Sequence, residues 1–489
     1  MRDLFLIGFL AALGLVGLRR PFLLVCGYMY IDIVAPQRLS FYLLSSVPLS
    51  LIFFMGAFVG WVIADDKAMS KPAPRQVLML LLLCLCAYTT NVADFPEAAQ
   101  EKWAWVWKAL VFAIFMPATL YTRVRIEGAL LFMLLSTASI IVVGAAKTLA
   151  GGGGYGMLNL MVSNNSGMYE GSTISAFAIA IVPLILYMSK YSTLAPPSPF
   201  ARLYWYALTF GCLLMPIGTQ ARTGLLCIGL VALLQLRSVK RKLLYLGMLA
   251  AVVAVAIPLL PASFTKRMDT IQGYKGDTSA ATRLAVWKWT IDYAEKNPFG
   301  GGFEVYRGNK LAIDIKYRTE DGTEVKAIGY DAGRAFHNSY FEMLGEQGYP
   351  GLILFLAIHL IGVVRMESIL REYRNEQGEH AWVAPLAMAL QHAHLVYLLG
   401  CSFVGIAFQP FIYYIVAIEI GFDRYVAAYV RKRIWKPFRT RKANDRAAAD
   451  VSATDDRSDD KGGDESPNPR DDAPERHRTK ARWGAVNGQ

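Results

Sequence analysis

Long apolar runs alternate with short polar segments along most of this chain. Several runs approach 20 residues, the length that a helix needs to cross the hydrocarbon core of a bilayer. The pattern predicts about thirteen membrane-spanning helices, or twelve if one of the two short N-terminal runs does not cross. The runs cover residues 4–18, 22–35, 47–64, 77–91, 103–121, 126–146, 173–188, 203–218, 223–236, 243–260, 352–364, 382–403 and 406–422.

The composition indicates the same fold class. Of the 489 residues, 54% are hydrophobic, and the mean hydropathy is positive, which exceeds what the core of a soluble protein requires. We therefore expect an all-α polytopic membrane protein.

Lys and Arg are concentrated in every second predicted loop, and this distribution predicts how the chain is oriented across the membrane. One set of loops is rich in Lys and Arg, whereas the opposite short loops hold single basic residues, and cytoplasmic loops carry such an excess. This predicts a cytoplasmic C-terminus and, with thirteen spans, an N-terminus outside. The first 35 residues lack a convincing signal cleavage site, so we expect them to be retained. The basic loops hold Arg19/Arg20, Lys67/Lys71/Arg75, Arg123/Arg125, Lys190/Arg202, Arg237/Lys240/Arg241/Lys242 and Arg365/Arg371/Arg374.

The cysteines and the net charge argue against a disulfide-rich, a zinc-binding or a nucleic-acid-binding protein. None of the six cysteines forms a CxxC pair, so neither a disulfide framework nor a zinc site is indicated. The net charge of +12 does not point to nucleic acid, because much of the excess lies beside predicted spans. Residues 431–442 suit an amphipathic segment on anionic lipid, and the polar chain from Ala443 predicts disorder. We therefore assign 423–489 to a basic juxtamembrane segment and a disordered cytoplasmic tail.

Two predicted outside loops are long enough to form a site. Residues 151–172 begin with four glycines, which suit either a flexible connector or backbone amides against a phosphate. The loop 261–348 has internal order: apolar spacing over 279–296 predicts a helix that Asn297-Pro298 ends, with Arg283 in its first turn. Alternation at Ile313, Ile315 and Tyr317 before Asp321-Gly322 predicts a hairpin. We expect a small folded unit.

The residues that could take part in a reaction lie on the predicted outer face. The chain has no P-loop, dinucleotide fingerprint, zinc helix or nucleophile elbow, and no metal or cofactor is indicated. His359, His392 and His394 lie within spans, where either a proton relay or hydrogen-bonded packing is expected. Arg222, Arg283 and His337 remain, and two cations with an imidazole suit a diphosphate leaving group and a general base.

These residues stand in motifs that carry a resemblance to a known family. Gln220-Ala221-Arg222-Thr223-Gly224, Thr282-Arg283 ahead of Asn297-Pro298-Phe299-Gly300, and His337-Asn338-Ser339-Tyr340 occur in an order that resembles the O-antigen ligase and polymerase superfamily over about 173–422. The N-terminal third, with Arg38 in Ala35-Pro36-Gln37-Arg38-Leu39-Ser40, the segment 96–108 and the glycine run, resembles putative O-glycosylation ligases associated with exosortase A systems.

The resemblance implies a glycosyltransferase with a GT-C-like helical fold in the bacterial inner membrane. It implies transfer of a glycan from undecaprenyl diphosphate to a hydroxyl of a lipid, protein or glycan acceptor on the periplasmic face, without metal and with inversion. Arg222 and Arg283 would bind the diphosphate, and His337 would orient or deprotonate the acceptor. Arg38, Glu170, Asn338 and Tyr340 become substrate-binding candidates. Where relatives carry an acidic-Asn-Asn run, this chain has Glu170-Gly171-Ser172, so only the acid is kept.

Two alternatives share these features. A repeat-unit polymerase uses the same donor and similar residues, so the sequence separates it poorly from a ligase. A non-enzymatic transporter of the lipid-linked glycan would be expected to show internal repeats and a central charged cavity, and neither is evident. The predicted organisation is an N-terminal transmembrane region (1–150), a periplasmic glycine-rich loop (151–172), a ligase-like core (173–422) that includes the loop 261–348, and the tail.

Overall fold

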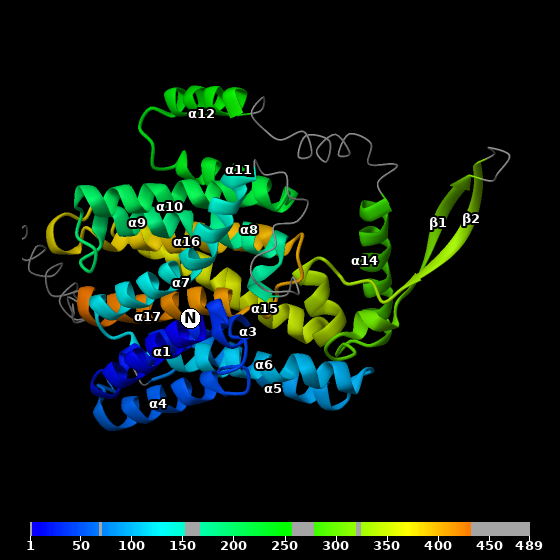
Figure 1. Cartoon of the computed structure of the whole chain (residues 1–489), viewed down its shortest axis with the longest axis horizontal. Helices are drawn as coiled ribbons and strands as arrows, with labels where there is room; N and C mark the ends of the chain where they lie inside the picture. Colours follow the sequence, from blue (N-terminus) through cyan, green and yellow to red (C-terminus); the bar gives the residue numbers. More distant parts are fainter. Residues whose placement is uncertain (1, 68–70, 152–166, 257–277, 319–323, 432–489) are drawn as a thin grey trace, which may run out of the picture. The chain divides into compact units, whose positions relative to one another are not determined.

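The described residues of the computed structural model, 2–67, 71–151, 167–256, 278–318 and 324–431, are almost entirely helical (Figure 1). As far as the described residues cover them, the thirteen predicted apolar runs lie largely within helices, which confirms the all-α class. The helices are α1 (Arg2–Arg19), α2 (Phe22–Val34), α3 (Pro36–Leu39), α4 (Leu49–Ala64), α5 (Pro74–Asn91), α6 (Pro96–Phe115), α7 (Arg123–Ala150), α8 (Gly171–Ala180), α9 (Val182–Tyr191), α10 (Pro199–Gly218), α11 (Arg222–Gln235), α12 (Lys242–Ala256), α14 (Thr278–Lys296), α15 (Ser339–Glu372), α16 (Val383–Cys401) and α17 (Pro410–Tyr425).

Several helices have the length and composition of membrane spans. Among the described residues five stretches qualify: Arg123–Ala150, Gly171–Tyr191, Pro199–Gly218, Ser339–Glu372 and Gly378–Cys401. Three shorter apolar helices, α2, α4 and α11, accompany them. The chain is therefore a multi-pass membrane protein, while the full number of twelve or thirteen crossings stays a prediction.

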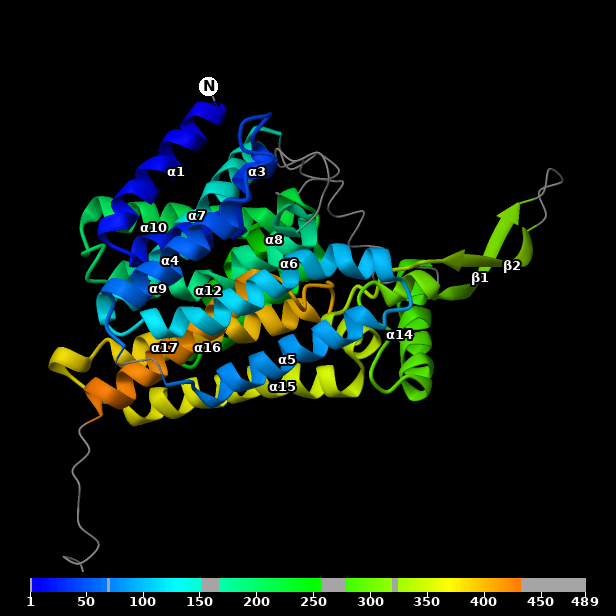
Figure 2. The ribbon, with the colours of Figure 1, turned by 90° about the horizontal axis from the view of Figure 1, so that it is seen from below.

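The burial pattern separates central helices from peripheral ones. Every residue from 411 to 422 in α17 is buried, as expected for a helix that is apolar all round and lies in the middle of a bundle. By contrast, α4 and α10 expose large apolar side chains such as Leu51, Met55, Leu203 and Phe210, which suit contact with lipid tails. Figure 2 shows α5, α15 and α17 running side by side.

Two predicted spans differ in detail from the helices observed. The span 173–188 is divided into α8 and α9 at Ile181, because Pro183 follows in the first turn of α9. α15 begins at Ser339, well before the predicted span at 352, and it is interrupted at Gly348 (φ 66°, ψ −166°). A Cβ at Gly348 would lie 2.1 Å from the Pro298 carbonyl oxygen, so only glycine fits this close approach.

The large loop contains the predicted helix and hairpin. α14 ends at Lys296 as predicted, and strands β1 (Lys310–Arg318) and β2 (Glu324–Ala332) pair antiparallel, with Ile313 opposite Gly329. The predicted turn at Asp321-Gly322 lies outside the described residues. α14 starts at Thr278, so Arg283 lies in its second turn, and the predicted placement in the first turn was wrong.

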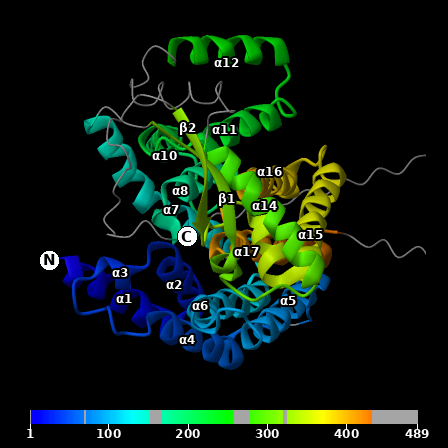
Figure 3. The same ribbon diagram turned by 90° about the vertical axis from the view of Figure 1, so that its right-hand side faces the viewer.

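A small second core fixes this unit to the helices. Val286, Val305, Leu311 and Phe336 are buried together, apart from the main core. Figure 3 shows α14 and the strands in front of the end of α15. Three parts of the chain lie outside the described residues: the glycine run after Gly151, Asn164 with Asn165, and the tail from Lys432. The six cysteines are free in the structure.

Candidate active site

A cavity of about 640 Å³ lies where the loop unit meets the helix ends. Segments far apart in the sequence form its wall: Arg38 beside α3, Lys102 and Trp105 of α6, residues 170–173 before and within α8, Arg283 of α14, residues 304–307, residues 335–337, Glu342 and Glu346 of α15, and residues 403–409. Four of the seven predicted site residues therefore line one cavity: Arg38, Glu170, Arg283 and His337. Its volume is typical of a small-molecule site.

His337 is presented to the cavity by an unusual backbone conformation. Its φ of 47° is left-handed, which is uncommon for a residue other than glycine and is often found at functional sites. On one side Phe336 is buried and its carbonyl accepts a hydrogen bond from Trp287 Nε1 at 2.9 Å. On the other side Asn338 caps α15. The imidazole is thus turned outward between two fixed neighbours and is exposed to the cavity.

Its surroundings keep the imidazole neutral. Desolvation by the cavity wall is the largest effect that lowers the pKa of His337, and the guanidinium groups of Arg283 and Arg334 lower it further, while Glu170 opposes them. A lowered pKa leaves the ring unprotonated at neutral pH. A neutral imidazole beside an arginine can accept a proton from a hydroxyl.

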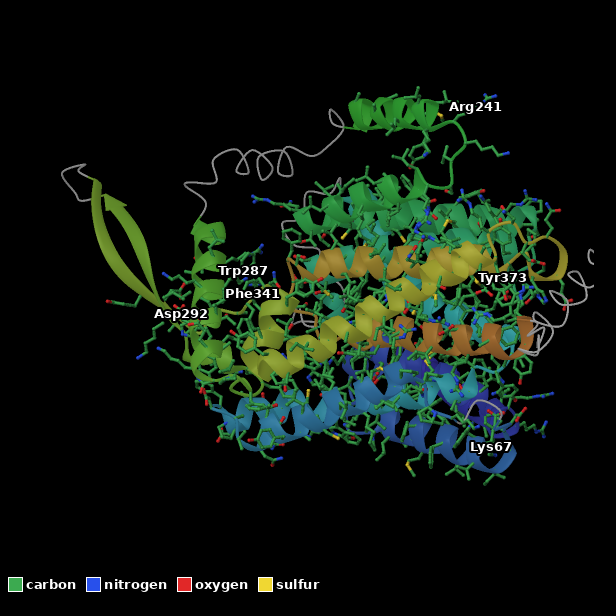
Figure 4. All side chains as sticks on the ribbon, turned by 180° about the vertical axis from the view of Figure 1, so that it is seen from behind. Lys67, Arg241, Trp287, Asp292, Phe341 and Tyr373 are labelled. Atoms are coloured by element: carbon green, nitrogen blue, oxygen red, sulfur yellow. The ribbon has the colours of Figure 1, made fainter. Side chains whose placement is uncertain are left out.

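Arg283 is placed by the α14 face that packs on α15. Trp287, one turn further along α14, stacks on Phe341 of α15 with ring centroids 5.1 Å apart, and Figure 4 labels both rings. Because side chains four residues apart share one helix face, Arg283 and Trp287 lie on the same side of α14. The stacked pair therefore ties the arginine to the start of the helix that follows His337.

Arg38 and Glu170 line the same cavity because the segments that carry them are joined. Arg38 lies in the short helix α3, after a left-handed residue, Ala35, ends α2. The Tyr169 hydroxyl donates to the Val34 carbonyl at 2.6 Å, which joins the segment before α8 to the end of α2. Glu170 also caps α8 by accepting from the Thr173 amide at 2.6 Å.

Arg222 is the first residue of α11 and is not among the residues that line the cavity. The corner between α10 and α11, residues 219–221, is tightly constrained. Gln220 has a left-handed φ of 53°, and the Thr219 and Ser175 hydroxyls lie 2.6 Å apart. A Cβ at Gly171 would approach the Thr219 Cβ to 3.3 Å. The corner that carries Arg222 therefore packs beside the segment that supplies Glu170.

The side chains of Asn338 and Tyr340 form hydrogen bonds with other parts of the protein. Asn338 Oδ1 accepts from the Tyr340 amide at 2.9 Å, and its Nδ2 donates to the Ser402 carbonyl at 3.0 Å. The Tyr340 hydroxyl donates to the Leu398 carbonyl at 2.9 Å. Neither residue lines the cavity, and their substrate-binding role stays a prediction.

Sequence reasoning gave no role to three further charged residues of the cavity wall, Lys102, Glu342 and Glu346. Lys102 Nζ donates to Glu342 Oε1 at 2.7 Å and to Glu346 Oε1 at 2.8 Å. The usable signal was the spacing of Glu342 and Glu346, four residues apart near the start of an apolar helix, where buried carboxylates need a partner.

Two of the three histidines within the spans, His359 and His394, belong to a hydrogen-bonded chain, and none of the three is among the residues that line the cavity. His359 Nδ1 and His394 Nε2 are 2.8 Å apart, His394 Nδ1 and Glu419 Oε1 are 2.8 Å apart, and Arg75 donates to Glu419 Oε2 at 2.7 Å. His392 is separate from this chain. The contacts fit hydrogen-bonded packing, and the proton-relay alternative stays open.

Comparison with known proteins gives two family matches and one relative. Residues 207–356 match the family described as O-antigen ligase, and residues 1–193 match a family of unknown function designated DUF5935. The exopolysaccharide production protein ExoQ of Rhizobium meliloti (strain 1021) is 30% identical over 163 residues, which is 33% of this chain and 35% of that protein. The chain thus aligns with about a third of the length of this relative. The match to the ligase family includes Arg222, Arg283 and His337.

Proposed function

We propose that this chain, which belongs to the O-antigen ligase superfamily, transfers a glycan from undecaprenyl diphosphate to an acceptor hydroxyl. The observation that carries the proposal is a cavity lined by both His337, whose imidazole is neutral, and Arg283, whose charge lowers the pKa of that imidazole. A base and a cation in one cavity are what glycosyl transfer from a diphosphate requires.

The proposed reaction is a single displacement. The acceptor oxygen attacks the anomeric carbon while the bond from that carbon to the diphosphate oxygen breaks. The hydroxyl proton passes to His337, or His337 only orients the hydroxyl and the proton leaves by another route. The electron pair of the broken bond goes to the diphosphate, whose charge Arg283 stabilises. Attack from the face opposite the leaving group inverts the anomeric configuration.

Arg222 and Arg38 complete the proposed diphosphate site. Arg222 lies on the corner that packs beside the Glu170 segment, and Arg38 lines the cavity directly. Guanidinium groups bind phosphate oxygens in a bidentate geometry and keep their charge at any physiological pH. With arginines neutralising the leaving group, the proposed transfer needs no metal ion.

The proposed location is the bacterial inner membrane with the cavity on the periplasmic side. The apolar helices support membrane insertion, and the clusters of Lys and Arg in alternate loops support the orientation. An undecaprenyl carrier would reach the cavity from the bilayer. The acceptor can be a lipid, a protein or another glycan.

The direct test is release of undecaprenyl diphosphate by the purified protein in liposomes. The donor is an undecaprenyl-diphosphate glycan, candidate acceptors are added, and the buffer contains a chelator. Transfer should occur in the wild type, and His337→Ala should lower kcat by about 10² to 10⁴-fold, the usual contribution of a general base. His380→Ala, in the turn Gly378–His380, is the matched control and should keep full activity. Full activity of His337→Ala would remove the proposed role.

A second candidate is a repeat-unit polymerase, favoured by the similarity to a protein named for exopolysaccharide production. In that reaction the acceptor is another lipid-linked glycan. The same assay separates the two, because a polymerase lengthens the glycan on its carrier, whereas a ligase moves it to a different acceptor. A transporter of the lipid-linked glycan would release no undecaprenyl diphosphate.

A further inference from the structure

The cavity wall is built from two parts of the chain that match different families. Arg283 and His337 lie within the match to the O-antigen ligase family. Arg38, Lys102 and Glu170 lie within the match to the family of unknown function. The N-terminal part of the chain, residues 1–193, therefore contributes directly to the candidate active site.

Lys102 of α6 is enclosed by groups from the ligase-like part. Its ammonium donates to Glu342 Oε1 at 2.7 Å and to both carboxyl oxygens of Glu346, at 2.8 and 2.9 Å. The ring centroids of Phe303 and Phe408 lie 5.4 and 5.6 Å from Nζ, and only 11% of the Lys102 side chain is exposed. An ammonium offers three donors, and three carboxyl oxygens lie within their reach. This cation therefore holds protein groups in place instead of binding a phosphate.

The two glutamates also bind the loops that form the cavity wall. Glu346 Oε1 accepts from the Glu304 amide at 3.0 Å, and Glu342 Oε2 accepts from the Ala407 amide at 3.1 Å. Both amides belong to segments that line the cavity. Glu304 has a left-handed φ of 63°, a conformation that persists only where the surroundings fix it. One cation thus links α6, α15 and two loops of the cavity wall.

The N-terminal part also contacts the loop that follows α14. The Tyr293 hydroxyl of α14 donates to Asp94 Oδ2 at 2.6 Å, and the Asp94 amide donates to the Gly301 carbonyl at 2.9 Å. A Cβ at Gly302 would approach the Thr89 carbonyl oxygen to 2.7 Å, so the two backbones lie close together. The helix that carries Arg283 is therefore anchored to the connection between α5 and α6.

The position of His337 depends on the same contacts. Glu342 follows His337 by five residues, and Glu342 and Glu346 lie in the first two turns of α15. The Glu346 side chain is fully buried, and that of Glu342 is 8% exposed. Loss of the Lys102 ammonium would leave both carboxyl groups without their cation, and a buried charge that loses its partner is strongly destabilising. The start of α15 would then shift, and His337 with it.

We infer that the N-terminal part of the chain completes the active site, and that Lys102 is the positioning residue through which it holds His337 and the cavity loops in place. The inference rests on the proposed function and gives a role in it to the part of the chain that matches a family of unknown function. Lys102 does not touch the reacting atoms; it acts through Glu342 and Glu346.

Lys102→Met in the full-length protein is the first test, with release of undecaprenyl diphosphate as the readout. We expect kcat to fall by about 10²-fold, the effect of roughly 1 Å of misplacement. The KM for the donor should change by less than about threefold, because the arginines still bind the diphosphate. The matched control is Arg75→Met, which removes another buried cation of the N-terminal part, 2.7 Å from Glu419 and away from the cavity lining. It should lower the melting midpoint and keep kcat, measured below that midpoint.

A triple variant separates position from stability. Lys102→Met combined with Glu342→Gln and Glu346→Gln removes the buried charges together, which costs less stability than removal of one partner. We expect a melting midpoint above that of Lys102→Met and a kcat still reduced by about 10²-fold, since the contact from α6 to α15 is lost. Wild-type kcat in Lys102→Met or in the triple variant would overturn the positioning role.

Hydrogen exchange tests the inference without turnover. The peptides that contain the Glu304 and Ala407 amides should exchange about tenfold faster in Lys102→Met and in the triple variant, because these amides lose a fixed acceptor. In Arg75→Met the same peptides should exchange as in the wild type. Wild-type exchange in both Lys102 variants would overturn the inference. Failure of the wild type to release undecaprenyl diphosphate would reject the reaction and leave the exchange comparison intact.

Discussion

The Trp287 ring of α14 lies parallel to the Phe341 ring of α15, with centroids 5.1 Å apart and an interplanar angle of 4°. Arg283 precedes Trp287 by four residues, and His337 precedes Phe341 by four. Trp287 also donates from Nε1 to the Phe336 carbonyl, next to His337. This single stacked pair therefore sets the position of one candidate cation relative to the candidate base.

Loss of that pair should impair transfer without touching a reacting group. Trp287→Ala removes the stacking and the hydrogen bond, and we expect kcat to fall by about 10²-fold, the effect of roughly 1 Å of misplacement. Trp287→Phe keeps a ring but loses the donor, so we expect a fall of about fivefold. The undecaprenyl diphosphate release assay measures both.

The neighbouring Trp289 provides the control. Its ring stacks on Tyr293 within α14 and does not contact the Phe336 carbonyl through its nitrogen. Trp289→Phe should keep wild-type kcat. An equal loss in the Trp287 and Trp289 variants would mean that α14 stability, and not the Arg283 position, limits the rate.

The pH dependence of transfer should report the charges around His337. The neutral imidazole is the active form, and its pKa is lowered, so kcat/KM should rise with pH to an inflection below about 6.5 and then level off. Arg334→Gln removes a cation that lowers this pKa, and the inflection should move to higher pH. Glu170→Gln removes an anion that raises it, and the inflection should move to lower pH. Shifts in one common direction would argue against His337 as the titrating group.

Local patterns predicted most of the fold. Apolar runs predicted every helix that they cover, because a long apolar segment in a bilayer must satisfy its own backbone hydrogen bonds as a helix. Asn297-Pro298 predicted the end of α14, and period-two alternation predicted the strands. The start of α15 was missed because Ser339 to Gln347 reads as a polar loop, whereas its carboxylates are buried against Lys102.

The site was only partly predictable for a different reason. Arg283 and His337 were identified by motif order, and no local pattern shows that Arg38 and Glu170 join them. The hydrogen bond from Tyr169 to Val34, which joins the two segments, spans 135 residues. The ion pairs of Lys102 with Glu342 and Glu346 span 240 and 244 residues. Such contacts are set by tertiary packing, so single-residue patterns do not reveal them.

The buried chain from His359 to Arg75 leads to a stability prediction at Gly362. A Cβ there would lie 2.3 Å from an Arg75 guanidinium nitrogen and 2.6 Å from Glu419 Oε2. Gly362→Ala must displace a buried ion pair, so we expect a loss of about 1 to 3 kcal/mol and a lower melting midpoint in detergent. Gly229→Ala in α11, where the new Cβ would have no described atom within 4 Å apart from the adjoining backbone of its own helix, should keep the midpoint or raise it slightly. Equal melting midpoints in the two variants would refute tight packing of the hydrogen-bonded side chains from His359 to Arg75 around Gly362.

The orientation across the membrane can be tested with single cysteines. The loop from α11 to α12 carries Lys240 among four basic residues, which favours the cytoplasm, and Figure 4 labels its Arg241. Tyr330 in β2 is 79% exposed and belongs to the unit that forms the cavity wall. In a background with the six native cysteines replaced, Tyr330→Cys should react with a membrane-impermeant maleimide in intact spheroplasts, and Lys240→Cys should react only after lysis. The opposite result would put the cavity on the cytoplasmic side and reject a periplasmic donor.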